Sequence, residues 1–300
     1  MHIIVTILLL ALGIVLIVKG GDFFVDAAAW TAEISGVPKV IIGATIVSLA
    51  TTLPEMLVSI LAAIDGKVDM SIGNAVGSVT ANLGLIMAVS IICMPAIIKK
   101  RDYLPKMIIM LAASAVIVLI GRLGSIQIGF SVILIVLFAM FFTENVLSAK
   151  KSLVREADTG EKRKADRKEI ILNVVKFVGG AAGIVIGARL LVDNGSELAR
   201  IAGVSERIIG VTLVAIGTSL PELITTITAV VKKQSELSVG NILGANIIDL
   251  TLILPLSSLV SGKPLPVSQQ SALMDLPACL IVGCIAVLPT VITSKFQRWQ

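Results

Sequence analysis

The 300-residue chain has one histidine, three cysteines, one tyrosine and two tryptophans, and only 15% of its residues are charged. The one histidine, His2, stands at the N-terminus, which excludes histidine-based catalysis and multi-histidine metal sites. Cys93, Cys279 and Cys284 lie in apolar runs without metal-ligand spacing, which argues against a disulfide framework or a zinc site. Soluble domains carry about 25% charged residues. A soluble enzyme, a disordered protein and a nucleic-acid-binding domain are therefore excluded.

Long apolar runs fill the chain instead. Hydrophobic residues make up 56% of the sequence, and the mean hydropathy is +1.00. A membrane-spanning helix needs about 20 mostly apolar residues. The sequence therefore predicts an all-α polytopic membrane protein with nine spans, near residues 3–18, 38–63, 70–97, 106–121, 125–147, 170–192, 207–231, 237–261 and 270–293.

The distribution of lysine and arginine predicts the orientation of these spans. If all nine cross the membrane, 19 basic residues lie on one side and 6 on the other, and eight of the 19 fall within residues 148–168. Basic residues favour the cytoplasmic side. We therefore expect the N-terminus outside and residues 148–168 as a solvated cytoplasmic loop of a plasma or cytoplasmic membrane protein. A regulatory or lipid-headgroup role for this loop stays open.

The chain repeats itself at an offset of 167 residues. Five spans separate the two copies, and an odd number makes them enter the membrane from opposite sides. Inverted repeats of this kind are typical of secondary transporters, whose site lies near the membrane midplane between the repeats. We expect a first repeat at 1–147 and a second at 169–300. The matching pairs include Ile41–Thr45 with Ile208–Thr212, Leu53–Glu55 with Leu220–Glu222, Gly73-Asn74 with Gly240-Asn241, and Gly77 with Gly244.

The offset also predicts an absent span. The segment at 125–147 should have an equivalent near 292–314, but the sequence ends at Gln300. We therefore expect a five-plus-five helix plan in which the tenth span is missing.

Each repeat interrupts one span with Leu-Pro-Glu. Proline has no N–H and clashes with the carbonyl four residues before it, so Pro54 frees the carbonyl of Ala50 and Pro221 that of Gly217. A freed carbonyl in hydrocarbon is costly unless it lines a polar cavity. Carbonyl, hydroxyl and carboxylate oxygens are ligands of hard cations, and all three types occur at each break.

Glu55 and Glu222 are the central pair of this pattern. An ionisable residue within a span is costly and usually functional. A structural glutamate, protonated or paired with a lysine, is the alternative, but neither span core contains a basic partner. Two glutamates at equivalent repeat positions favour a shared cation site.

A second motif follows each break. Ser78 and Asn82 lie four residues apart and hence on one helix face, which Ala245 and Asp249 occupy in the second repeat. The Gly-x-x-x-Gly pairs Gly73/Gly77 and Gly240/Gly244 predict close helix packing. Asn74 and Asn241 fit either interhelical hydrogen bonds or a gating role.

With these doubled motifs, Thr-[Ser/Thr]-Leu-Pro-Glu and Gly-Asn-x-x-Gly, the chain resembles the Na⁺/Ca²⁺ exchanger family of the cation/Ca²⁺ antiporter superfamily. The resemblance covers both repeats and implies a ten-helix fold with the second, third, seventh and eighth spans at its centre. It implies a Ca²⁺ site formed by Glu55, Glu222 and the carbonyls of Thr51 and Thr218. It further implies Na⁺ sites that add Ser48, Thr52, Ser78, Ala215 and Ser219, with Asn82 and Asp249 closing the middle.

Three positions depart from the family pattern. Ala245 stands where a serine equivalent to Ser78 is common, so one Na⁺ site is weakened or lost. Ser48 stands where a small residue is usual, which leaves a carbonyl ligand intact, and Ala50 replaces a glycine at the break.

The resemblance implies a monomeric secondary antiporter, not an enzyme, that exports Ca²⁺ in exchange for Na⁺ by alternating access. Ca²⁺ and Na⁺ would be transported substrates, with the lipid bilayer as the other partner and no organic cofactor. Ca²⁺/H⁺ exchange is the alternative, which Ala245 favours. A passive cation channel leaves the inverted repeats unexplained, and an intramembrane enzyme lacks its sequence motifs. A structural protein would tolerate glutamine at both glutamates.

Overall fold

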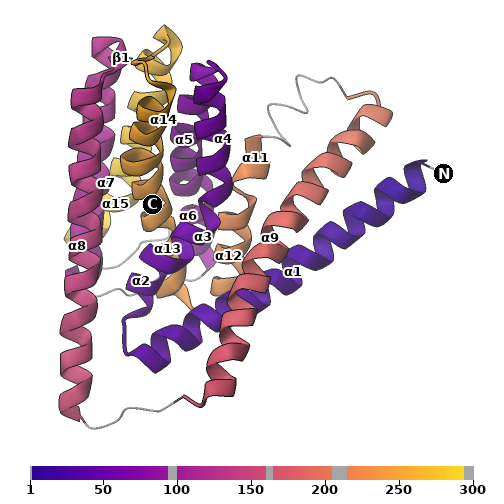
Figure 1. The fold of residues 1–300 in the computed structure, drawn as a ribbon, viewed down its shortest axis with the longest axis vertical. Coiled ribbons are helices and arrows are strands. Elements are labelled where there is room, and N and C mark those ends of the chain that lie inside the picture. Colours follow the sequence, from indigo (N-terminus) through magenta and orange to yellow (C-terminus); the bar gives the residue numbers. More distant parts are fainter. Residues whose placement is uncertain (1, 94–99, 160–164, 205–214, 294–300) are drawn as a thin grey trace.

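The computed structural model describes residues 2–93, 100–159, 165–204 and 215–293, and nearly all of them are helical (Figure 1). The first half contains α1 (His2–Ser35), α2 (Lys39–Ile42), the π-helix η1 (Gly43–Val47), α3 (Ser48–Thr51), α4 (Leu53–Ile64), α5 (Val68–Ala81), the π-helix η2 (Asn82–Ile86), α6 (Met87–Cys93), α7 (Lys100–Leu123), β1 (Ser125–Ile126) and α8 (Ile128–Thr159). The second half contains α9 (Arg167–Ile201), α11 (Ala215–Thr218), α12 (Leu220–Val231), α13 (Ser235–Ile248), the π-helix η4 (Asp249–Ile253), α14 (Leu254–Ser261), β2 (Leu265–Pro266), the π-helix η5 (Ser271–Asp275) and α15 (Leu276–Thr293).

The predicted all-α membrane fold is confirmed. Seven helical segments within the described residues are long and apolar enough to cross a membrane, and the bent pair of Lys39–Thr51 and Leu53–Ile64 adds an eighth. The two halves of that pair meet at 47°. The predicted span at 207–231 is described only from Ala215 onward, where α12 is a shorter apolar helix. One feature was not predicted, a short antiparallel pairing of β1 with β2.

Three predicted boundaries are wrong because the helices continue past the apolar segments. α1 extends from the predicted end at residue 18 to Ser35, and α9 extends from 192 to Ile201. α8 runs to Thr159, so residues 148–159 of the predicted loop are helical. The serines at the start of this extension bond within the helix, Ser148 to the Glu144 carboxylate at 2.9 Å and Ser152 to the Ser148 carbonyl at 3.0 Å. Polar residues of this kind extend a helix beyond the apolar segment that predicts it.

The 167-residue offset predicted from the sequence is also present in the secondary structure. Moving each of three elements by 167 residues gives the bounds of its equivalent without any shift: α4 gives α12, α5 gives α13, and η2 gives η4; the end of α3 likewise gives the end of α11. We call residues separated by this offset repeat equivalents. Because the equivalent helices have the same bounds, the burial and contacts of equivalent residues can be compared directly.

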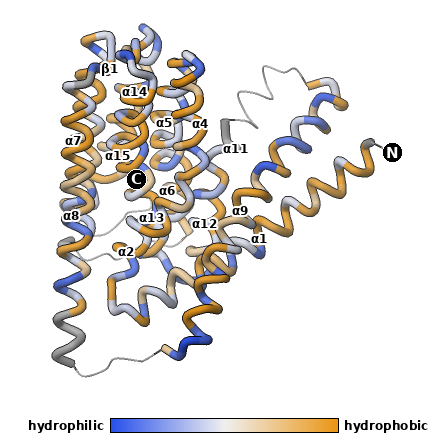
Figure 2. The backbone as a smooth tube through the Cα atoms, in the orientation of Figure 1, coloured by the Kyte–Doolittle hydropathy of each residue, from blue (hydrophilic) through white to orange (hydrophobic). Residues whose placement is uncertain are grey.

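Helix α13 lies at the centre of the molecule, and every residue from Leu237 to Ile248 is buried. Helices α7, α8 and α15 stand on one side of it, and α1 and α9 lie together on the other and lean away from the bundle (Figure 1). α1 and α9 approach so closely at Gly20 and Gly180 that a Cβ on Gly180 would lie 2.7 Å from the Gly20 carbonyl oxygen. Hydrophilic residues gather at the lower end of α8 and the start of α9 and at turns of the opposite end (Figure 2). This distribution suits a bilayer around the apolar middle.

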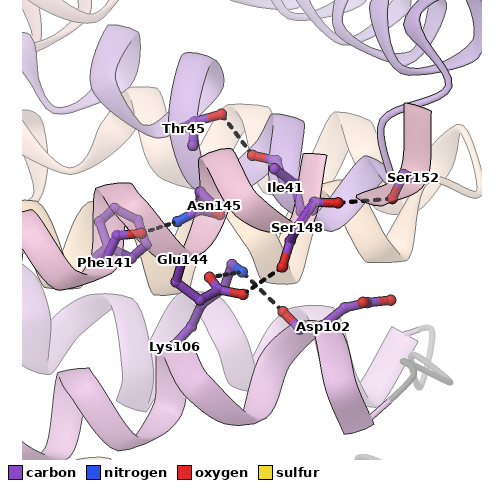
Figure 3. Close-up of polar contacts among 9 residues, drawn as sticks. All are labelled: Ile41, Thr45, Asp102, Lys106, Phe141, Glu144, Asn145, Ser148 and Ser152. Carbon is purple, nitrogen blue, oxygen red and sulfur yellow. Dashed lines mark hydrogen bonds and ion pairs between the residues drawn. The ribbon is translucent and has the colours of Figure 1, made fainter. Parts of the chain in front are cut away.

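An ion pair joins α7 to α8 beside the α2–η1 segment (Figure 3). Lys106 Nζ lies 2.8 Å from Glu144 Oε2 and donates to the Asp102 carbonyl at 3.0 Å. The Lys106 side chain is fully buried, whereas that of Glu144 is 18% exposed. The pair therefore fixes the two helices beside the central bundle, away from the predicted cation site.

Candidate functional site

The two Leu-Pro-Glu breaks place Glu55 and Glu222 at the N-termini of α4 and α12. Thr52 and Ser219 precede these helices, and each proline occupies the first turn, where its missing N–H costs no hydrogen bond. Both glutamates are 1% exposed. The N-terminus of a helix carries a partial positive charge that stabilises a nearby carboxylate. Each repeat therefore supplies one buried carboxylate at a helix N-terminus.

The two carboxyl groups face each other between the repeats, and Asp249 lies near enough to interact electrostatically with both. On Glu55, Glu222, Asp249 and Asn82, six buried acceptor oxygens have no hydrogen-bond partner among the described residues: both oxygens of Glu55, Oε2 of Glu222, both oxygens of Asp249, and Oδ1 of Asn82. Leaving a buried acceptor unsatisfied costs about 1–3 kcal/mol, and more if it is charged. A bound cation would satisfy such a set of oxygens.

Hydroxyl groups of both repeats surround the carboxylates. Thr52 Oγ1 lies 3.5 Å from Glu222 Oε1, and Ser78 Oγ lies 3.0 Å from Ser219 Oγ. Thr51 Oγ1 donates to Asn241 Oδ1 at 3.1 Å. All three contacts cross from one repeat to the other. The predicted residues Glu55, Glu222, Thr51, Thr52, Ser78 and Ser219 are thus brought together.

Asn82 and Asp249 each begin a π-helix, which neither sequence motif predicts. Asn82 and Asp249 are both at most 1% exposed. Asn82 Nδ2 donates to Asn246 Oδ1 at 3.0 Å. Single π-turns within α-helices occur frequently at functional sites. Because Asn82 and Asp249 are repeat equivalents, each repeat contributes one π-helix beside the site.

Three predicted ligands stand apart from this cluster or are only partly described. The Ser48 hydroxyl donates to the Thr45 carbonyl at 3.2 Å and faces α13, where a Cβ on Gly244 would lie 2.5 Å from it. The Ser48 carbonyl already accepts from the Thr52 hydroxyl at 2.6 Å and the Thr52 N–H at 2.9 Å. Thr218 is half-buried in α11, and Ala215 is described only by its backbone in the same helix.

The glycine prediction is confirmed in the second repeat; in the first, the segment equivalent to α2 and η1, residues 205–214, lies outside the described residues. A Cβ on Gly244 would lie 2.6 Å from the Ala44 carbonyl, and one on Gly240 would meet the Val40 carbonyl, so α13 packs directly on α2 and η1. Gly73 and Gly77 are exposed, and a Cβ on either would meet nothing within 4 Å. The described part of the chain places no helix against this face of α5.

The two repeats also differ in how closely α1 and α9 pack against the broken helices. On one side, Lys232 Nζ contacts Asp26 Oδ1 at 2.8 Å and Asp22 Oδ1 at 3.3 Å, which ties α12 to α1. We call these three residues the Lys232 cluster. On the other side, a cavity of about 160 Å³ lies between α4, α9, α11 and α12. We call it the proline cavity, since both break prolines line it; its lining is Pro54, Val58, Val185, Ala188, Arg189, Val192, Asp193, Gly217, Thr218 and Pro221.

Three asparagines outside the predicted ligand set also contribute, and one of them, Asn246, was not identified from the sequence. Asn241 bonds to Thr51, Asn246 bonds to Asn82, and Asn74 donates to the Glu55 carbonyl at 3.2 Å and to Ser59 Oγ at 2.9 Å. Asn74 is therefore an interhelical hydrogen-bond donor, as one of the two sequence interpretations expected, whereas Asn241 accepts from Thr51 and its Nδ2 has no partner among the described residues. A buried polar residue in an apolar helix is the signal that could have identified Asn246.

The described residues contain no group of three or more histidine, cysteine, aspartate or glutamate side chains close enough to hold a metal ion by themselves. Cys93, Cys279 and Cys284 are free thiols. A cation between Glu55 and Glu222 would draw its further ligands from hydroxyl and carbonyl oxygens and from water. Carboxylate, hydroxyl and carbonyl oxygens together suit hard cations such as Ca²⁺.

Comparison with known proteins agrees with this chemistry. The family described as sodium/calcium exchanger protein matches residues 5–145 and 172–300. The chain is 30% identical to the sodium/calcium exchanger MaX1 of Methanosarcina acetivorans, over 99% of this chain and 94% of MaX1. It is 33% identical to the inner membrane protein YrbG of Escherichia coli, over 89% of this chain and 84% of that protein.

A solved structure shares the whole architecture. The sodium-calcium exchanger NCX_Mj, from crystals soaked with Na⁺ and Sr²⁺, superposes with a TM-score of 0.84 at 29% identity, covering 99% of this chain and 94% of that one. MaX1 and NCX_Mj are exchangers, which are transporters rather than enzymes. The chain therefore belongs to the sodium/calcium exchanger family of membrane transporters.

Proposed function

We propose that this protein is a secondary antiporter that exports Ca²⁺ from the cytoplasm in exchange for Na⁺ by alternating access. The observation that supports this most is the buried pair Glu55 and Glu222, one from each repeat, with three carboxylate oxygens that have no hydrogen-bond partner among the described residues. Two adjacent buried carboxylates cannot both stay ionised without a compensating charge. One Ca²⁺ or several Na⁺ ions would supply that charge, so the two substrates compete.

The proposed ligands follow from the arrangement of the cluster. Ca²⁺ would bind both glutamates and the carbonyls of Thr51 and Thr218. Na⁺ ions would use the same glutamates with the hydroxyls of Thr52, Ser78 and Ser219, and with Ser48 and Ala215. Asn82 and Asp249 would close the middle of the site. Exchange follows because a site carrying two uncompensated carboxylates is too costly to reorient while empty.

Alternating access is supported by the unequal packing of the two repeats. The Lys232 cluster ties α12 to α1, whereas the proline cavity separates α4 from α9. We propose inverted repeats at 1–147 and 169–300, with the N-terminus outside and the basic stretch 148–168 cytoplasmic. α9 would then run outward, so the cavity beside its C-terminal half would open to the outside.

The test is Ca²⁺ uptake into proteoliposomes containing the full chain, driven by a Na⁺ gradient in one arm and a pH gradient in the other. We expect uptake in the Na⁺ arm, and its loss in Glu55→Gln and Glu222→Gln, since each removes a carboxylate from the site. Asp69→Asn, which neutralises an exposed carboxylate on α5, serves as the control and should transport normally. Normal flux in either glutamate variant would refute the site.

Ca²⁺/H⁺ exchange is the second candidate, because Ala245 is fully buried and offers no side-chain oxygen where its equivalent Ser78 contacts Ser219. If Na⁺ is the coupling ion, Ala245→Ser should lower the Na⁺ concentration for half-maximal exchange or leave it unchanged, because it restores a hydroxyl. The measurement is the Na⁺ dependence of Ca²⁺ uptake. A sharp loss of Na⁺ dependence, or uptake in the pH arm alone, would favour H⁺.

A further inference from the structure

The repeat equivalents of the Lys232 cluster carry a second pair of opposite charges. Lys232 on α12 corresponds to Asp65 at the end of α4, and Asp22 on α1 corresponds to Arg189 on α9. The charge is reversed at both positions. Arg189 and Asp65 would therefore attract each other, as Asp22 and Lys232 do. Of these two sets of charges, only the Lys232 cluster forms ion pairs among the described residues.

Arg189 and Asp65 lack such a contact here. Arg189 is exposed and lines the proline cavity, and no ion pair to it is found among the described residues. Asp65 lies 3.5 Å from Lys67, and both side chains are more than half exposed. An exposed pair of this kind contributes little to stability, so Asp65 can exchange partners at small cost.

The apolar residues beside these charges differ in the same way. Leu57 and Leu61 on α4 are 53% and 57% exposed. Their equivalents on α12, Ile224 and Thr228, are half-buried and pack against α1, where a Cβ on Gly21 would lie 2.8 Å from Thr228 Oγ1. The Leu57–Leu61 face of α4 is therefore placed to receive α9 as Ile224 and Thr228 receive α1.

We propose that Arg189 and Asp65 are positioning residues of the exchange cycle, which pair with each other when α9 closes on α4 and eliminates the proline cavity. The inference rests on the proposed alternating access. The Lys232 cluster would open in the same step, so the two ion pairs would form in turn. Asp193, the equivalent of Asp26, also lines the cavity and would repel Asp65. The Arg189–Asp65 pair is therefore the weaker of the two.

Charge reversal tests the pairing directly. Arg189→Asp and Asp65→Lys should each lower the maximal Na⁺-driven Ca²⁺ uptake about fivefold, the ratio that an ion pair of about 1 kcal/mol sustains. The double variant should recover to within about twofold of wild type, because it recreates on α4 and α9 the polarity of Lys232 and Asp22. A lysine at the C-terminus of α4 also suits the helix dipole, so the variant should fold.

Lys67→Gln is the matched control, since it removes the contact that Asp65 makes in this structure. It should leave uptake within about twofold of wild type, the same margin used for the double variant, because a surface pair contributes little. Losses that multiply in the double variant, or a Lys67→Gln loss equal to that of Asp65→Lys, would overturn the inference.

A second readout does not require exchange. In a chain with Cys93, Cys279 and Cys284 replaced by serine, Val192→Cys places a thiol in the cavity lining. Either single charge reversal should make a water-soluble thiol reagent modify this cysteine faster than in the double variant, because the pair that closes the cavity is lost. Asp193→Asn should slow the modification, because it removes the repulsion of Asp65. Equal rates in all four would refute the pairing. Wild-type protein that fails to exchange would refute the proposed function alone.

Discussion

Lys106 and Glu144 show how burial decides what a single charge costs. The pair lies outside the proposed cation site and has no equivalent in the second repeat, where Leu273 takes the place of Lys106. Lys106 is enclosed completely, while Glu144 keeps 18% of its side chain exposed and also accepts from Ser148. Loss of the counter-ion should therefore cost more free energy for Lys106 than for Glu144.

Glu144→Gln should destabilise the protein more than Lys106→Met. The first change leaves a fully buried ammonium without its counter-ion, which costs about 3–5 kcal/mol. The second leaves a carboxylate with partial exposure and one remaining donor, so its cost should be smaller. The measurement is unfolding in detergent, with exposed Lys150→Gln as the control. Equal losses, or the reverse order, would show that the burial difference does not set the cost.

The residues of the site differ in how far the sequence predicts them. Glu55 and Glu222 were predictable because an acidic residue after proline, repeated at a fixed offset in apolar segments, has few structural explanations. Asn241 was not, since its contact with Thr51 joins residues 190 positions apart. Ser48 was assigned as a ligand, but its hydroxyl bonds within its own helix and faces α13. Side-chain direction depends on packing that a motif does not contain.

At the scale of helices, the two Gly-x-x-x-Gly pairs have identical spacing and opposite surroundings. Gly244 lies under the backbone of η1, where any side chain would clash with Ala44 or Ser48. A Cβ on its equivalent, Gly77, would meet nothing within 4 Å among the described residues. A sequence pattern predicts that such a face can pack closely, and the backbone placed against it decides whether it does.

Gly244→Ala should therefore destabilise this state by about 1–3 kcal/mol, the range for overpacked sites, whereas Gly77→Ala should leave its stability unchanged. If the repeats exchange conformations during transport, Gly77→Ala should still slow exchange, because Gly77 would then need the close packing that Gly244 has here. Unfolding and Ca²⁺ uptake measured on both variants separate these effects. Equal loss of stability in the two would contradict the packing difference.

Helix existence was predictable along this chain and helix ends were not. Apolar segments of about 20 residues predicted each span, but α1, α8 and α9 continue through charged residues. In α1 the continuation is stabilised by contacts distant in sequence, since Asp22 and Asp26 bond to Lys232. Hydropathy predicts which residues lie in lipid. It does not predict the hydrogen bonds and ion pairs that extend a helix into water, so it does not locate the helix ends.

At the scale of the whole molecule, the Lys232 cluster holds α12 against α1 while the proline cavity stays open. Partial burial lowers the pKa of Lys232, but Asp26 and Asp22 raise it by more, so the pKa lies above its ordinary value. A raised lysine pKa gives stabilisation that is complete below about pH 10.4 and is lost as pH rises through the folded-state pKa. The cluster should therefore hold unchanged across physiological pH.

Lys232→Gln should shift the population away from this state, because it removes both ion pairs to α1. The expected result is a fall of about fivefold in the modification rate of Val192→Cys, the ratio for about 1 kcal/mol. Lys233→Gln, next in sequence, is the control and should have no effect. An unchanged rate in Lys232→Gln would mean that apolar packing alone keeps α12 against α1.

The π-helices at Asn82 and Asp249 alter the angular phase of the helices that follow them. A π-turn closes its hydrogen bond over five residues instead of four, and thus holds one residue more than an α-turn. Since each residue of an α-helix turns the chain by about 100°, α6 and α14 face a direction that an unbroken helix would not give them. A helical wheel drawn across Asn82 or Asp249 therefore assigns later side chains to the wrong face, whereas deletion of the one extra residue would turn the π-turn into an α-turn and leave the helix beyond it in place.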